Sequence, residues 1–229
     1  MKTTVLLPGT LCDERVFGAL PQHLAQPLAL DYSAWADTRT AAAALLSKVP
    51  AGSIGIAFSL GSWVLLEMLR LAPKRFAGII LVSGNAYPDA PENAKMRRDR
   101  VALARAEGFS ALFADDWPKM LGHKHRDDPA LRRLIVAMAE HAGHESHARQ
   151  AEANISRPDH RQYASASPIP VHVIAGTEDG LCPRERYEAA ANGPGSSLTM
   201  VADTGHYLPL EAPVALRSLI NARFPEYFI

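Results

Sequence analysis

Three polar residues, spread along the chain, are of the types that together activate a hydroxyl group for nucleophilic attack: Ser59, Asp179 and His206. A serine hydroxyl is a poor nucleophile until an imidazole takes its proton. The imidazole in turn needs a carboxylate that fixes its tautomer and stabilises its cation. We therefore expect these three side chains to meet, although they stand in three separate loops.

The serine lies where the sequence pattern changes from strand to helix. Residues 53–57 form a short apolar run, and an almost wholly apolar helix is expected after the serine, ending before Pro73. Two positions either side of Ser59 stand Ala57 and Gly61, and such small residues let a strand turn sharply into a helix. A serine before a helix is commonly an N-cap. The strand–turn–helix setting nevertheless favours a nucleophile elbow, with the hydroxyl at a helix N-terminus.

The histidine and the acid are selected by their positions after expected strands. Of nine histidines, only His206 follows a strand-end glycine and precedes an apolar helix interrupted by proline. Asp179 follows another strand, and its neighbours Glu178 and Asp203 are alternative carboxylates. At the other plausible acid position, after the fourth strand, the chain carries the amide Asn85. Asp179 is therefore the preferred acid.

These loops belong to a regular alternation of strands and helices, which predicts an α/β fold. Strands are expected at residues 2–7, 28–32, 53–57, 76–83, 171–175 and 197–202. Helices are expected at residues 14–24 with Asp13 as cap, at 38–49 with Thr38 as cap, and at 60–72, 183–191 and 210–223. The prediction is an open, mostly parallel sheet of about six strands with helices on both faces, whose strand carboxyl ends share one edge.

The middle of the chain has a different character. Residues 86–165 contain no convincing strand, but helical patterns occur at 95–107, 110–121 and 129–141. We predict a helical cap, or lid, inserted into a core domain formed by residues 1–85 and 166–229.

Composition narrows the possible functions. Lys+Arg and Asp+Glu are equal at 24 each, so no basic field suggests nucleic acid. Two distant cysteines, Cys12 and Cys182, form neither a disulfide framework nor a zinc motif. No apolar run is long enough for a signal peptide or a membrane span. The expectation is a cytoplasmic protein without membrane or nucleic-acid partners.

Four segments together resemble the α/β-hydrolase superfamily, and more closely its small capped esterases and lactonases: residues 7–17, 57–61, 170–179 and 205–213. The resemblance implies Ser59 as nucleophile, Asp179 as acid and His206 as base. It further implies an oxyanion hole formed by the backbone N–H groups of Thr10 and Leu60, and a reaction without metal or cofactor.

We therefore predict a carboxylesterase that acts on a small to medium, uncharged or weakly polar small-molecule ester. A lactonase, a thioesterase, a carrier-linked methyl esterase, a C–C bond hydrolase and a cofactor-free haloperoxidase would use the same triad. A hydrolase-like protein that only binds a ligand is the alternative of another class. Three residues depart from the family pattern: Pro8 replaces a histidine, and Ala57 and Ser62 replace glycines.

Substrate contacts are expected from the loops and the cap, at Leu11, Phe58, Phe113, Trp117 and Tyr207. The cap residues Phe109, Phe113, Trp117, Met120 and Leu121 could line an acyl pocket or form the cap's own core. A basic run could dock an acyl-carrier protein or a coenzyme A thioester, but is more commonly a solvated face. It comprises Lys95, Arg97, Arg98, Arg100 and Arg105.

A histidine-rich stretch needs its own assessment. His141, His144 and His147 stand near two glutamates, but their spacing does not match a metal-binding H-E-x-x-H motif. The segment is polar throughout, so we expect a solvated helix and no metal.

Overall fold

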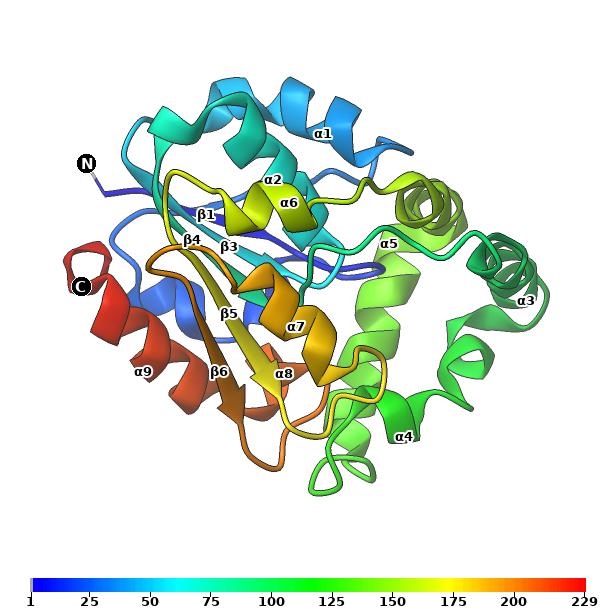
Figure 1. Ribbon diagram of the computed structural model, residues 1–229. Coiled ribbons are helices and arrows are strands. Elements are labelled where there is room, and N and C mark those ends of the chain that lie inside the picture. Colours follow the sequence, from blue (N-terminus) through cyan, green and yellow to red (C-terminus); the bar gives the residue numbers. More distant parts are fainter. Residues whose placement is uncertain (1) are drawn as a thin grey trace.

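The computed structural model describes residues 2–229, and these contain one six-stranded, wholly parallel sheet (Figure 1). The strands are β1 (Thr4–Leu7), β2 (Pro27–Ala29), β3 (Ser53–Phe58), β4 (Phe76–Val82), β5 (Val171–Gly176) and β6 (Ser197–Val201). Their order is β2-β1-β3-β4-β5-β6. The chain thus leaves β1 in one direction and β3 in the other, and such a reversal creates a crevice at the strand carboxyl ends.

Helices cover both faces of the sheet, as expected. One face carries α1 (Thr38–Leu45), α2 (Gly61–Leu71), α6 (Arg161–Ser165) and α7 (Arg184–Ala190), and the other carries α9 (Pro213–Arg223) (Figure 1). Alternate residues of a strand point to opposite faces of the sheet. Leu7 therefore packs against the helices of the first face, and Leu6 packs on the face that carries α9. Burial on both faces explains why the strands are continuous apolar runs in the sequence.

The insertion between β4 and β5 is helical. Its members α3 (Asn93–Phe113), α4 (Trp117–Met120) and α5 (Pro129–Ser156) lie beyond the carboxyl ends of the strands (Figure 1). Glycines with positive φ kink two of them, Gly108 at 85° and Gly143 at 78°. The short α6, within the expected cap range, instead packs beside α7 on the sheet. No helix in residues 2–229 combines the length and apolarity needed to cross a bilayer.

Several expected helices differ in extent. Residues 14–24 form two 3-10 turns, Glu14–Phe17 and Leu20–His23, because Gly18 adopts a φ of 54° between them. The cap of α1 is Asp37, whose carboxylate accepts from the Thr40 amide at 2.9 Å, so Thr38 is the first helical residue. The terminal helix is divided by Pro213 into α8 (Leu208–Glu211) and α9.

The insertion helices also differ from their predicted ranges. The helical spans run from Asn93 to Phe113 and from Pro129 to Ser156, but each consists of two helices that meet at a kink, at Gly108 in the first and at Gly143 in the second. The predicted ends at residues 107 and 141 lie within two residues of these kinks, so what differs from the prediction is the helical stretch that follows Gly143.

Candidate active site

Ser59 stands in the tight turn between β3 and α2. Its φ is 49°, a left-handed conformation that costs a non-glycine residue free energy and commonly marks functional sites. The turn also brings α2 against the loop after β1: a Cβ atom at Gly61 would lie 2.5 Å from the Leu7 carbonyl oxygen. Only glycine fits at position 61, in agreement with the expected elbow.

The departure at Ser62 has a structural compensation. The Ser62 side chain occupies space beside Gly84, where a Cβ atom would lie 1.8 Å from the Ser62 hydroxyl oxygen. The larger residue on α2 is thus accommodated by a glycine after β4. Ala57 fits without such a change and is fully buried.

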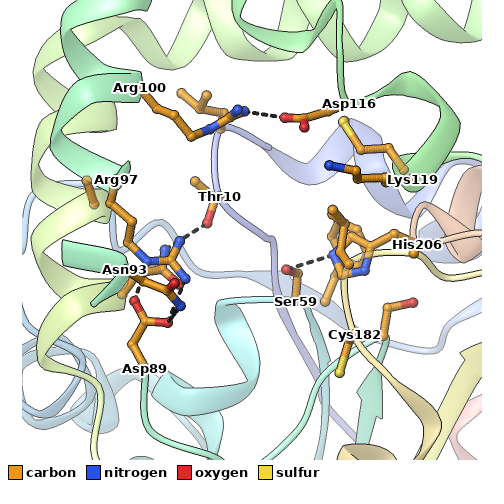
Figure 2. A pocket seen from close by; sticks show the side chains of 18 of the residues that line it. Thr10, Ser59, Asp89, Asn93, Arg97, Arg100, Asp116, Lys119, Cys182 and His206 are labelled. Carbon is orange, nitrogen blue, oxygen red and sulfur yellow. Dashed lines mark hydrogen bonds and ion pairs between the residues drawn. The ribbon is translucent and has the colours of Figure 1, made fainter. Parts of the chain in front are cut away.

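A chain of hydrogen bonds joins three loops at the carboxyl edge of the sheet. The Nε2 atom of His206 lies 3.0 Å from the Ser59 hydroxyl oxygen (Figure 2), and its Nδ1 atom lies 2.7 Å from Oδ2 of Asp179. Asp179 follows β5, and His206 follows β6. The His206 amide also donates to the Met120 carbonyl at 2.8 Å, which ties the histidine loop to α4.

Asp179 is fixed and ionised by its surroundings. Its Oδ1 atom accepts from the amides of Leu181 at 2.8 Å and Cys182 at 3.1 Å, and its Oδ2 atom accepts from the Tyr187 hydroxyl. Burial alone would raise the pKa of Asp179, but the His206 charge and these hydrogen bonds outweigh it and hold the pKa below 3.8. The carboxylate can therefore orient the imidazole and stabilise its cation.

The alternative acids have other partners. Glu178 accepts from the His123 amide at 2.6 Å, and Asp203 pairs with Lys124 at 2.5 Å. Asn85 donates toward the Cys182 sulfur at 3.2 Å. Of the four candidates, it is Asp179 that the structure brings to His206.

The two expected oxyanion donors flank the serine. Leu60 immediately precedes α2, and Thr10 follows β1 in the adjacent loop. Within residues 2–229, no group accepts a hydrogen bond from either amide. Gly9 allows the loop to approach, since a Cβ atom there would lie 2.8 Å from the Phe58 ring. Two unpaired amides beside a serine hydroxyl are suited to binding a developing oxyanion.

A cavity of about 650 Å³ opens over Ser59 and His206. Of the expected substrate contacts, Leu11, Phe58, Phe113 and Tyr207 line it. Trp117 does not: it packs against Phe113 within the insertion, with ring centroids 5.5 Å apart. The insertion aromatics therefore divide between pocket and core. Met120 joins the lining, whereas Phe109 and Leu121 belong to the core.

Charged residues that sequence reasoning did not assign to the site also line the cavity. Asp89, with a side chain 2% exposed, pairs with Arg97 at 2.5 Å (Figure 2) and with Arg157 at 3.3 Å. Burial would raise the pKa of Asp89, but the hydrogen bond from Arg97 and the adjacent Arg157 charge keep it low. Two arginines thus share one carboxylate, so this group of three side chains has a net charge of +1.

The basic run divides between the cavity and the outside. Arg97 and Arg100 line the cavity, and Arg100 pairs there with Asp116 at 2.6 Å (Figure 2). Arg98 and Arg105 instead pair with Glu152 and Glu145 on α5. Two further cavity cations come from outside the run: Lys119 and Arg186 have no carboxylate partner among residues 2–229.

The expectation of a solvated histidine helix is wrong for His147. This side chain is 6% exposed and lines the cavity, and His144 stacks on Phe109 with centroids 4.7 Å apart. Burial, and secondarily Arg100, lower the pKa of His147 to about 4. In the described chain, a metal-like grouping occurs elsewhere, at His123, Glu178 and Asp203, where Lys124 already pairs with Asp203.

Comparison with known proteins gives a consistent result. The pimeloyl-[acyl-carrier protein] methyl ester esterase of Methylococcus capsulatus is 30% identical over 182 residues, covering 75% of this chain and 68% of that protein. The thermophilic esterase from Thermogutta terrifontis matches with a TM-score of 0.85 and 23% identity, covering 100% of this chain and 91% of its own.

The enol-lactonase from Burkholderia xenovorans has a TM-score of 0.82 and 20% identity, with coverage of 96% of this chain and 89% of its own. At these identities the two structures show a shared fold. A model of the alpha/beta hydrolase family matches residues 5–219. On this match, which covers most of the sequence, the chain belongs to the alpha/beta hydrolase family.

Proposed function

We propose that the protein is a serine hydrolase that cleaves a carboxylic ester through an acyl-enzyme. The observation that carries the proposal is the unbroken contact from Asp179 through His206 to Ser59 beside the cavity. A protein that only binds a ligand has no need of this arrangement or of a strained serine. The lactonase and thioesterase alternatives use the same groups and differ in the substrate that the cavity admits.

In the first half of the reaction, His206 Nε2 takes the proton of Ser59 while the serine oxygen attacks the ester carbonyl. The carbonyl oxygen gains negative charge and is bound by the amides of Thr10 and Leu60; losing one such donor typically costs about 3 kcal/mol of transition-state stabilisation. Asp179 stabilises the imidazolium. The tetrahedral intermediate then collapses, and the departing alcohol takes the proton from His206.

In the second half, a water molecule replaces the alcohol. His206 removes a proton from the water, the resulting hydroxide attacks the acyl-serine carbonyl, and the same two amides bind the oxyanion. Collapse returns the proton to Ser59 and releases the carboxylic acid. The protein groups end in their starting states.

An ester with an anionic group, such as a carrier-linked methyl ester, is a more specific candidate. The positively charged side chains of the cavity favour such a substrate. Among residues 2–229, Lys119 and Arg186 have no carboxylate partner, and the buried Nε atom of Arg157 has no hydrogen-bond partner. The relative from Methylococcus capsulatus is named for a substrate of this kind.

Labelling with a fluorophosphonate tests the proposed activity without knowledge of the natural substrate. The probe should modify Ser59, as read by mass spectrometry of the labelled peptide, and a p-nitrophenyl ester series should be hydrolysed. Ser59→Ala and His206→Ala should each abolish labelling while the melting temperature stays close to that of the wild type. An unlabelled wild-type protein that binds ester analogues would favour the binding-only alternative.

A further inference from the structure

The loop that carries the Thr10 amide is held in an unusual conformation. Leu11 adopts a φ of 56° although it is not glycine, and it is 3% exposed. The Cys12 amide donates to the Gly9 carbonyl at 3.2 Å. Because a trans peptide places its C=O and N–H on opposite sides, this bond fixes the plane that contains the Thr10 N–H group. The histidine expected in this loop is Pro8, so any further restraint must come from elsewhere.

That restraint comes from α5, far away in the sequence. The Leu11 amide donates to the side-chain oxygen of Gln150 at 2.8 Å, and the Asn154 side-chain amide donates to the Thr10 hydroxyl at 3.2 Å. Gln150 and Asn154 are four residues apart and thus share one face of the helix. They are 3% and 5% exposed, so water does not compete for these contacts.

Asn154 is itself held in place. Its side-chain nitrogen also donates to the Gln150 carbonyl at 3.0 Å, and its oxygen accepts from Arg157 at 2.8 Å. Arg157 in turn pairs with Asp89, in the segment that leads from β4 to α3. The two amides of α5 are therefore part of a connected buried network.

We propose that Gln150 and Asn154 are positioning residues that set the oxyanion hole from the insertion. Gln150 fixes the peptide plane after Thr10, while the Cys12–Gly9 bond fixes the plane before it, so the Thr10 N–H direction is determined on both sides. Removal of Gln150 leaves a buried amide without a partner, and the left-handed turn at Leu11 relaxes to satisfy it. The Thr10 donor then moves off the oxyanion while Ser59, His206 and Asp179 keep their contacts.

The proposal rests on the proposed esterase function and is tested with Gln150→Leu, which removes the acceptor at similar size. For a p-nitrophenyl ester, kcat should fall about tenfold, part of the loss seen when an oxyanion donor is removed altogether, and KM should stay within about twofold. The inhibition constant of a trifluoromethyl ketone, whose hemiketal oxygen occupies the oxyanion position, should rise by the same factor as kcat falls.

The matched control is Gln162→Leu, the same change at an exposed residue of α6, which should alter none of these constants. Thr10→Val, which removes only the hydroxyl that accepts from Asn154, should lower kcat about threefold and decides the matter if Gln150→Leu does not fold. Unchanged kcat and ketone affinity in a folded Gln150→Leu, or equal effects on kcat and KM, would overturn the positioning role. A wild-type protein that the fluorophosphonate does not label would instead overturn the proposed function.

Discussion

The nearly buried carboxylate of Asp179 accepts four hydrogen bonds, one of them from His206. Its contribution to the reaction can therefore be tested separately from those of Glu178 and Asp203, which have other partners. Asp179→Asn should lower kcat by about 10⁴-fold, because an amide can hold the wrong imidazole tautomer and offers no charge to the cation. Asp203→Asn and Glu178→Gln, which alter exposed or surface-paired carboxylates, should keep kcat within about twofold. Steady-state kinetics of the three variants check this. A larger loss of kcat in Glu178→Gln than in Asp179→Asn would mean that Asp179 is not the acid of the triad.

The low pKa of Asp179 also fixes the sign of a pH effect. The pKa of Asp179 in the folded protein lies below the ordinary value of 3.8 that it has in the unfolded chain. Ionised Asp179 therefore stabilises the fold fully above pH 3.8, and this stabilisation is lost as the pH falls through the folded pKa. Its protonation therefore does not set the acid limb of the rate profile at pH 5 and above.

His147 produces a pH effect in a higher range. Its pKa is about 4 in the folded protein against an ordinary 6.5, because the site is buried and faces Arg100, Arg105 and His144. The unfolded chain then binds the proton more readily, so stability is full above pH 6.5 and is lost as pH falls toward 4. The loss should approach about 3 kcal/mol.

Urea unfolding at pH 7, 5.5 and 4.5 measures this loss. His147→Gln, which cannot gain the proton, should flatten the decline in unfolding free energy between pH 6.5 and 4. His141→Gln, on the same helix but exposed, is the control and should leave the decline as it is in the wild type. An equal decline in wild type and His147→Gln would mean that another group is responsible.

At the scale of elements, two glycines separate lack of space from backbone strain. Gly61→Ala should destabilise the fold by about 3 kcal/mol and lower kcat, because the new Cβ atom meets the carbonyls of Leu7 and Pro8, which lead into the oxyanion loop. Gly143→Ala places no atom within 4 Å of the new Cβ, but a φ of 78° with a ψ of 168° suits only glycine, so this change should cost up to about 3 kcal/mol in strain and leave kcat unchanged. Thermal unfolding and kinetics compare the two. Equal effects of the two substitutions on kcat would contradict the role of the close approach at Gly61.

The strands could be predicted, and the loops that carry Ser59, Asp179 and His206 could be selected, because each depends on a local signal. A strand buried on both faces is a continuous apolar run, and an elbow needs small residues around the serine. The partition of the basic run could not be predicted. Arg97 and Arg98 are adjacent on a helix that is polar on both the cavity side and the solvent side, so no hydrophobic stripe indicates which side faces inward.

The same reason explains the error at His147. A cavity wall made of histidine, glutamine and asparagine has the polarity of a solvated surface when only the sequence is considered. Gln150 and Asn154 carried no motif, because their function is a contact with residues about 140 positions away. The cap of α1 is misplaced in the prediction for a different reason, because Asp37 and Thr38 are both competent caps. The two 3-10 turns replace the expected helix because Gly18 adopts a positive φ.

At the scale of the whole molecule, zero net charge conceals a local excess. The cavity lining contains two carboxylates, Asp89 and Asp116, both paired. The cations that line it are Arg97, Arg100, Lys119, Arg157 and Arg186. A low-dielectric cavity focuses such a field, so an anionic ester should be attracted and a neutral one should not.

The comparison that tests this uses the monomethyl ester of a dicarboxylic acid and the methyl ester of the matching monoacid. The kcat/KM for the anionic ester should fall at least threefold between 0.02 M and 0.3 M salt, while that for the neutral ester stays constant, because salt screens the attraction. Lys119→Met should lower only the anionic value. Lys95→Met, on α3 outside the cavity, should lower neither. Equal salt dependence for both esters would mean that the cations serve the fold and not the substrate, whereas a difference removed by Lys119→Met would place the anion of the substrate beside the insertion.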